Sequence, residues 1–238
     1  MTRVTEGLFF NSSRPELVID PDPQTGHKFV KVRLRNAPPE IAHILTGEII
    51  YHLRSSLDQI AVALGRLSVA RPNVKKIYFP TGDRLKAFKV SIRNNAQGLD
   101  LDFIKLIIRL KPYDGGNDAL RSIFRLGNID KHLELIPAAA SGNIAGINDF
   151  TIKDAIRGLI LSGMQPLNEG ITISELSPTG SITPNNSESQ IKVAGQIIFG
   201  NVSIYNGKSI VGTLNSLVNL MESVLQNFTT HCRKTGRI

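Results

Sequence analysis

The first regular pattern of apolar and polar residues covers positions 27–35, where apolar and basic side chains alternate loosely (HKFVKVRLR). An approximate period of two is typical of a half-exposed strand. Asn36 and prolines at positions 38 and 39 follow directly. An Asn cap and a Pro in the first turn indicate the start of a helix, because Pro needs no amide partner there. We therefore expect a strand at 27–35 and a helix from Pro39.

The helical pattern that begins at Pro39 continues to about Leu67, with an apolar residue every three or four positions. The opposite side of this helix also carries apolar residues, namely Ile44, Tyr51 and Val62. A helix that is apolar on both sides is expected to be central and largely buried. Two shorter helices are expected at 84–94 and 100–110. A further helix should run from an Asp118 cap to about Ile136, where Pro137 ends it.

After Pro137 the pattern changes to short apolar runs separated by turn residues, with one short helix expected at 152–161. We expect the strands to pair in one antiparallel sheet, with two sheets as the alternative that the sequence leaves open. The amphipathic helix at 209–230 should pack onto the earlier helices. The predicted strands lie at 144–147, 171–174, 191–193 and 196–205, with a turn at 183–189. The predicted fold class is α+β, an N-terminal helical core (about 37–136) with a C-terminal antiparallel sheet closed by an amphipathic helix (about 137–232), in a single domain, 1–238.

Composition narrows the class of protein. The chain has 238 residues, of which 41% are hydrophobic, and this apolar content excludes wholesale disorder. Its single cysteine, Cys232, excludes a disulfide framework and Cys-based zinc patterns and fits a reducing compartment. The first 16 residues contain only a very short apolar stretch, and no apolar run approaches the length needed to span a bilayer, so we expect neither secretion nor membrane insertion. We therefore expect a cytoplasmic protein with no membrane partner, no metal and no cofactor.

Charge is concentrated in one segment. The chain has a net charge of +8, and residues 66–93 hold eight basic residues against Asp83 alone, a net charge of +7. Such a stretch indicates a polyanionic partner, including nucleic acid. The alternative is a solvated basic loop, because only Tyr78, Phe79 and Phe88 are present to stack on bases. The candidate nucleic-acid-binding residues are Arg66, Arg71, Lys75, Lys76, Arg84, Lys86, Lys89 and Arg93.

Arg125, Asn128 and His132 form the strongest candidate for catalysis. The seven-residue step from Arg125 to His132 returns to within about 20° of the same direction on a helix, so the three side chains share one side. An imidazole that transfers protons, a guanidinium that holds a phosphate and an orienting amide suffice for metal-independent RNA cleavage. Gly127 within this helix indicates a close approach by another group. The alternative is that these side chains bond to neighbouring groups and have no catalytic role.

Arg54 and Asp58 are four residues apart on the long helix. If that helix is buried, the two should be ion-paired or shared with a neighbouring helix. Asp58 would orient His132 if the two helices face each other, as in a carboxylate–imidazole dyad. The alternative is a salt bridge that only fixes the packing of the helices.

Two stretches of sequence resemble known families. The segment Gly47–Asp58 (GEIIYHLRSSLD) and the later Asn128–His132 (NIDKH) resemble a family of small bacterial and phage proteins with LRSxLD and NIDKH helices, followed by strands and a closing helix. This resemblance covers about residues 38–230 and implies an architecture more than an activity.

A weaker similarity is to HEPN domains, helical modules of toxin and defence systems. Many of these are ribonucleases with an Arg-x(4–6)-His motif, which the spacing of Arg125 and His132 matches, although Leu126 replaces the polar residue usual after the Arg. The similarity implies that His132 acts as general acid or base and that Arg125 holds the scissile phosphate, in a cleft shared by two protomers.

Our working hypothesis is a HEPN-like, RNA-binding protein that acts as a metal-independent endoribonuclease of a defence or toxin–antitoxin kind. Its expected partners are RNA, a cognate antitoxin or defence partner, and a second copy of the chain in a homodimer. The alternative is a non-catalytic interaction module, in which Arg54, Asp58, Asn128 and His132 form a buried polar network that specifies packing.

Overall fold

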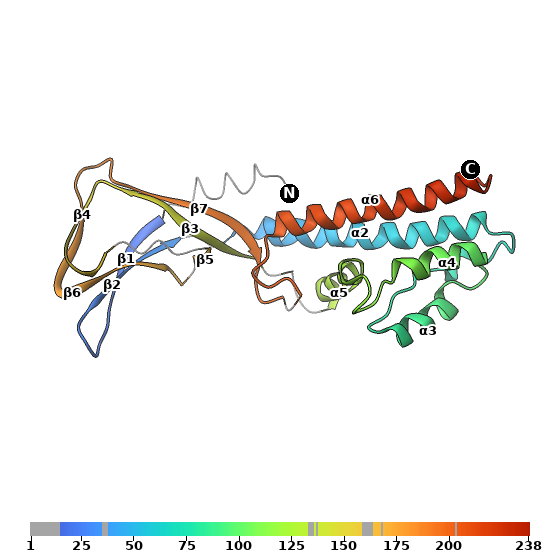
Figure 1. Ribbon diagram of the computed structural model, residues 1–238, viewed down its shortest axis with the longest axis horizontal. Helices are drawn as coiled ribbons and strands as arrows, with labels where there is room; N and C mark the ends of the chain where they lie inside the picture. The colour runs from blue at the N-terminus through green and yellow to red at the C-terminus, as the bar shows by residue number, and fades with distance from the viewer. Residues whose placement is uncertain are drawn as a thin grey trace. The chain divides into compact units, whose positions relative to one another are not determined.

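The computed structural model describes residues 15–34, 38–132, 136, 138–158, 164–167, 169–202 and 204–238, without the side chains of 130–132. The fold is α+β, as the sequence predicts. The chain forms two compact units, one of Met1–His43 with Pro137–Val211 and one of Ile44–Ile136 with Gly212–Ile238. The first contains the strands and the second contains most of the helical residues (Figure 1).

The strand unit contains two antiparallel sheets, so the prediction of one sheet is wrong. Apolar residues of both sheets are fully buried, including Val32, Ile173 and Phe199. Two sheets can bury their apolar faces against each other, whereas a single sheet would need another layer to cover it. One sheet has the order β1 (Pro15–Pro21), β2 (Lys28–Leu34), β6 (Ile171–Pro184) and β4 (Phe150–Arg157), and the other β5 (Gln165–Pro166), β3 (Ala138–Asn148) and β7 (Gln190–Phe199).

Strand β4 corrects the helix predicted at 152–161. It pairs with β6, and the pairing register shifts between Lys153 and Ala155 and again between Ala155 and Arg157. Each irregularity breaks the period-two alternation of the strand, so its apolar residues fall at helix-like spacing. Asp154 has a left-handed φ of 51°, which an α-helix does not accommodate. Residues 159–161 of the predicted helix lie outside the described residues.

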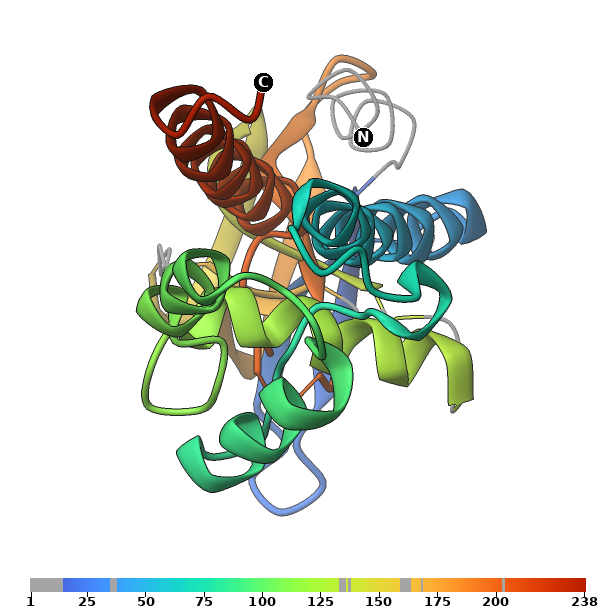
Figure 2. The same ribbon diagram turned by 90° about the vertical axis from the view of Figure 1, so that its right-hand side faces the viewer.

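The helical unit is built mainly from the elements that the apolar periodicity predicts. The predicted packing of the last helix onto the helical core is confirmed, because that helix groups with the others from Gly212 onward. In Figure 2 the long helix α2 and the last helix run beside each other, and α5 runs across α2. The elements are α2 (Glu40–Leu67), the 3₁₀ turn η1 (Val74–Lys76), α3 (Leu85–Asn95), α4 (Leu101–Leu110), α5 (Asp118–His132) and α6 (Ile210–Lys234).

Burial along α2 is less complete than predicted. Ile50 and Leu57 are fully buried, but Ile44 and Tyr51 are 38% and 49% exposed. The expectation of a helix buried on both sides is therefore wrong at these two residues, since the buried side chains are confined to the stripe that faces its neighbours.

The caps of two helices were predicted from sequence. Asn117, one residue before the predicted Asp118, caps α5, because its Oδ1 accepts the Leu120 amide at 2.9 Å. Asp118 instead accepts the Gly115 amide. The Asn36 cap predicted for α2 lies outside the described residues. Across the described part of the chain, no helix is both long enough and apolar enough to cross a bilayer.

Candidate nucleic-acid interface

The eight basic residues of the segment 66–93 are all exposed. Arg66 lies in the last turn of α2, and Lys75 and Lys76 lie in η1, where the Asn73 side chain accepts the Lys75 amide at 3.1 Å. Arg71 lies in the loop between α2 and η1, and Arg84 directly precedes α3. The other three, Lys86, Lys89 and Arg93, lie on α3. Within the described part of the chain, none of the eight forms an ion pair. Their charges are therefore directed at solvent.

Asp83 is the one acidic residue in this segment, and its carboxylate is bound by Arg121 of α5. The Arg121 side chain is only 9% exposed, whereas that of Asp83 is 79% exposed. The Nε of Arg121 also lies 3.7 Å from Oδ1 of Asp114. The segment's only carboxylate is thus engaged by a buried cation from another helix, and it does not offset the exposed basic side chains.

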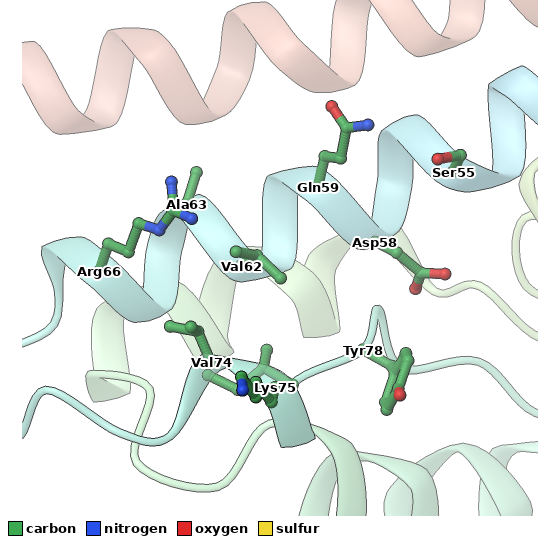
Figure 3. Close-up of a pocket in the computed structure, with 10 residues that line it drawn as sticks. Ser55, Asp58, Gln59, Val62, Ala63, Arg66, Val74, Lys75 and Tyr78 are labelled. Carbon is green, nitrogen blue, oxygen red and sulfur yellow. The ribbon is translucent and has the colours of Figure 1, made fainter.

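A pocket of about 610 Å³ lies between α2 and the chain that follows it (Figure 3). Arg66 lies at one end of the pocket, Asp58 and Tyr78 lie at the other, and Lys75 lies between them. The Tyr78 side chain is 53% exposed. The remaining lining residues are Ser55, Gln59, Val62, Ala63, Val74 and Ile77.

Contacts with α2 and α5 hold the wall of this pocket in place. The Phe79 amide donates to Oδ1 of Asp58 at 2.9 Å, and the buried Phe79 ring stacks on Phe124 with centroids 6.3 Å apart. Gly65 allows Ile77 to approach α2, because a Cβ at position 65 would lie 2.5 Å from Ile77 Cδ1. The backbone beside Tyr78 is therefore fixed, while its side chain reaches solvent.

The predicted catalytic residues differ in their exposure and in their bonding partners. Arg125 is 43% exposed, and its Nη1 lies 3.9 Å from Oδ2 of Asp114. Asn128 accepts a hydrogen bond from Arg54, and Asp58 accepts one from Phe79. His132 is the last residue of α5, and its side chain lies outside the described residues, so its pairing with Asp58 stays a prediction.

Arg54 joins α2 to α5. Its Nη1 donates to Oδ1 of Asn128 at 2.7 Å, and its Cζ lies 5.6 Å from the centre of the Phe124 ring. A Cβ on Gly127 would lie 3.1 Å from Arg54 Cδ, so the close approach predicted at this glycine is the passage of the Arg54 side chain. Arg54 is thus shared with a neighbouring helix, one of the two arrangements that the sequence predicts.

Sequence reasoning missed several residues that shape this region. Nothing in the local sequence pattern distinguishes the exposed Tyr78 from the buried Phe79. Arg121 precedes Arg125 by four residues, a spacing that places both on one side of α5. This spacing predicts a second cation beside Arg125 on α5. Asp114, which approaches both arginines, lies in a loop and gave no such signal.

Comparison with models of protein families, with curated proteins and with solved structures finds no match to this chain. Among the described residues, no three His, Cys, Asp or Glu side chains are grouped so that they could hold a metal ion.

Proposed function

We propose that this chain is a cytoplasmic, HEPN-like nucleic-acid-binding protein whose ligand is RNA. The observation that carries the proposal is the exposure of all eight basic residues in 66–93, with Asp83 engaged by Arg121. Basic side chains on a protein surface displace counterions from a nucleic acid, which favours binding and makes it salt-dependent. Tyr78 supports single-stranded RNA as the ligand, because an exposed aromatic ring can stack on an unpaired base.

Charge reversal with a matched control tests this proposal. Lys86→Glu with Lys89→Glu changes two exposed charges on α3, and Lys153→Glu with Lys192→Glu makes the same change on exposed residues of the strand unit. Fluorescence anisotropy with labelled single-stranded RNA should show at least about tenfold weaker binding for the first pair only. Equal loss in both pairs, or no binding by the wild type, would contradict the proposal.

The proposal extends to metal-independent cleavage of the bound RNA. Arg125 would hold the scissile phosphate, and His132 would act as general acid or base at the 2′-hydroxyl. The exposed guanidinium of Arg125 supports this role. Asn128 and Asp58 already accept hydrogen bonds from Arg54 and Phe79, which does not support a catalytic role for them. A homodimer, with a cognate antitoxin or defence partner, belongs to the same proposal.

A second candidate is the non-catalytic interaction module. It is favoured by the contacts of Arg54, Asp58 and Asn128, which connect α2 with α5 and with the loop at Phe79. In this candidate the basic segment still binds a polyanion, but no bond is cleaved. RNA cleavage by the wild type that is lost in His132→Ala would exclude it.

A further inference from the structure

The side chains that line the pocket beside Tyr78 are chemically complementary to a nucleotide. Val62, Val74 and Ala63 make the lining partly apolar. One end carries the Tyr78 ring and the Asp58 carboxylate, Arg66 lies at the other end, and Lys75 lies between them (Figure 3). Arg66 follows Asp58 by eight positions on α2, a rise of about 12 Å. The Asp58 carboxylate, which accepts hydrogen bonds, and the Arg66 guanidinium therefore lie at opposite ends of the cavity.

Each end matches one part of a nucleotide. A base has flat apolar faces that stack on an aromatic ring, and a phosphate pairs with Arg and Lys. The volume of about 610 Å³ is in the range of small-molecule sites. A duplex keeps its bases stacked inside, so only an unpaired base can enter such a pocket.

Asp58 restricts the kind of base. One of its oxygens, Oδ1, accepts the Phe79 amide at 2.9 Å, which fixes the carboxylate at the pocket wall. An ionised carboxylate is an acceptor only. It therefore favours a base with adjacent N–H donors on its pairing edge, and guanine presents both N1–H and the 2-amino group there.

We propose that this pocket binds one unpaired guanine nucleotide, with the base against Tyr78, its donor edge at Asp58, and its phosphate at Arg66 and Lys75. The inference rests on the proposed RNA binding and names the part of the RNA that the protein recognises. The basic residues on α3 would contact the flanking phosphates without regard to sequence.

The test uses labelled oligouridines of about 12 nucleotides, with or without one central guanine, and a duplex of the same length. Wild type should bind the guanine-containing strand more tightly than oligouridine. Tyr78→Ala should weaken that binding by about 5- to 100-fold, the range of one base stack, while Tyr78→Phe should retain it. Duplex binding should be the same in both variants.

Asp58→Asn tests the base preference separately. Asn keeps an oxygen to accept the Phe79 amide, so the fold should survive, but it replaces the second acceptor with a donor. This variant should bind the two single strands equally, with a melting temperature near that of the wild type. A retained guanine preference would overturn the role of Asp58.

A titration with guanosine monophosphate separates this inference from the proposed function. The amide resonance of Phe79 reports on the pocket, and it should shift saturably in the wild type and not in Tyr78→Ala. Such a shift without any RNA binding would refute the proposed function but support nucleotide binding in the pocket. If no shift occurs and Tyr78→Ala binds RNA as tightly as the wild type, the proposed guanine site is refuted, whereas the proposed RNA binding is not.

Discussion

The Nη1 of Arg54 donates to Oδ1 of Asn128 at 2.7 Å, and this bond ties the middle of α2 to the C-terminal half of α5. One turn further along α2, Asp58 holds the backbone of Phe79, whose ring stacks on Phe124 of α5. The same two helices therefore position the wall of the pocket and carry the exposed Arg125. The contacts between α2 and α5 therefore stabilise the helical packing and also position the proposed binding surface.

Removal of Arg54 should loosen this connection. We expect Arg54→Ala to lower the free energy of unfolding by about 1 to 2 kcal/mol, because it removes a hydrogen bond from a charged donor and a partly exposed cation–π contact. Asn128→Ala should not add fully to this loss in the double variant, with a coupling of about 1 kcal/mol. Urea unfolding of the four proteins measures the coupling, and strict additivity would show that the bond contributes nothing.

Gly127 offers a second test of the same packing. Alanine in a helix is favoured over glycine by about 1 kcal/mol. In the wild type, a Cβ at this position would crowd Arg54 at 3.1 Å, which should cancel this gain. In the Arg54→Ala background, Gly127→Ala should stabilise the protein by up to about 1 kcal/mol. An equal effect in both backgrounds, measured by urea unfolding, would contradict the crowding.

How much of this molecule the sequence predicts depends on how local each signal is. The positions of the helices follow mainly from apolar periodicity. Strand β4 was mistaken for a helix because its shifts of register disturb the alternation, and the number of sheets depends on which distant strands pair. In the candidate site, the spacing of Arg54 and Asp58 predicts the sharing of Arg54, and the presence of Gly127 within a helix predicts the close approach. The pocket was not predicted, because it depends on tertiary contacts such as that of Asp58 with Phe79.

The stability of the protein at acid pH should depend on Asp102 of α4, which contacts His231 and Arg237 at the C-terminal end of the chain. Its Oδ2 lies 2.5 Å from Nε2 of His231, and its Oδ1 lies 3.3 Å from Nη2 of Arg237, which also bonds to Asp100. Burial raises the pKa of Asp102, but the hydrogen bond from His231 and the charge of Arg237 outweigh it, so the pKa lies below its usual value of 3.8.

A lowered pKa in the folded state gives stability that is present above the unfolded pKa and is lost as the pH falls through the folded value. Asp102→Asn should therefore be less stable than wild type at pH 7, by less than about 1 kcal/mol because the group is partly exposed. It should also lose less stability than wild type on acidification below about pH 4. Urea unfolding across this range checks both, and parallel curves would contradict the assignment.

Cleavage of RNA tests the catalytic part of the proposal. In EDTA, wild type should cut mixed RNA and leave double-stranded DNA intact, because the proposed mechanism uses the 2′-hydroxyl and no metal. His132→Ala should lose this activity by at least about 100-fold with an unchanged melting temperature. Arg125→Ala should lose it similarly, and Arg125→Lys should retain part. No cleavage by wild type, with a lower melting temperature in His132→Ala, would favour the interaction module.

The central claim, RNA binding by the exposed basic segment 66–93, is tested most directly by the salt dependence of binding. Each basic contact with a single strand adds about 0.7 to the slope of log affinity against log salt concentration. The variant with Lys86, Lys89 and Arg93 all changed to Ala should therefore have a slope about two units smaller than wild type. Lys153→Ala with Lys192→Ala should leave the slope unchanged. Equal slopes for wild type and the α3 variant would contradict the claim.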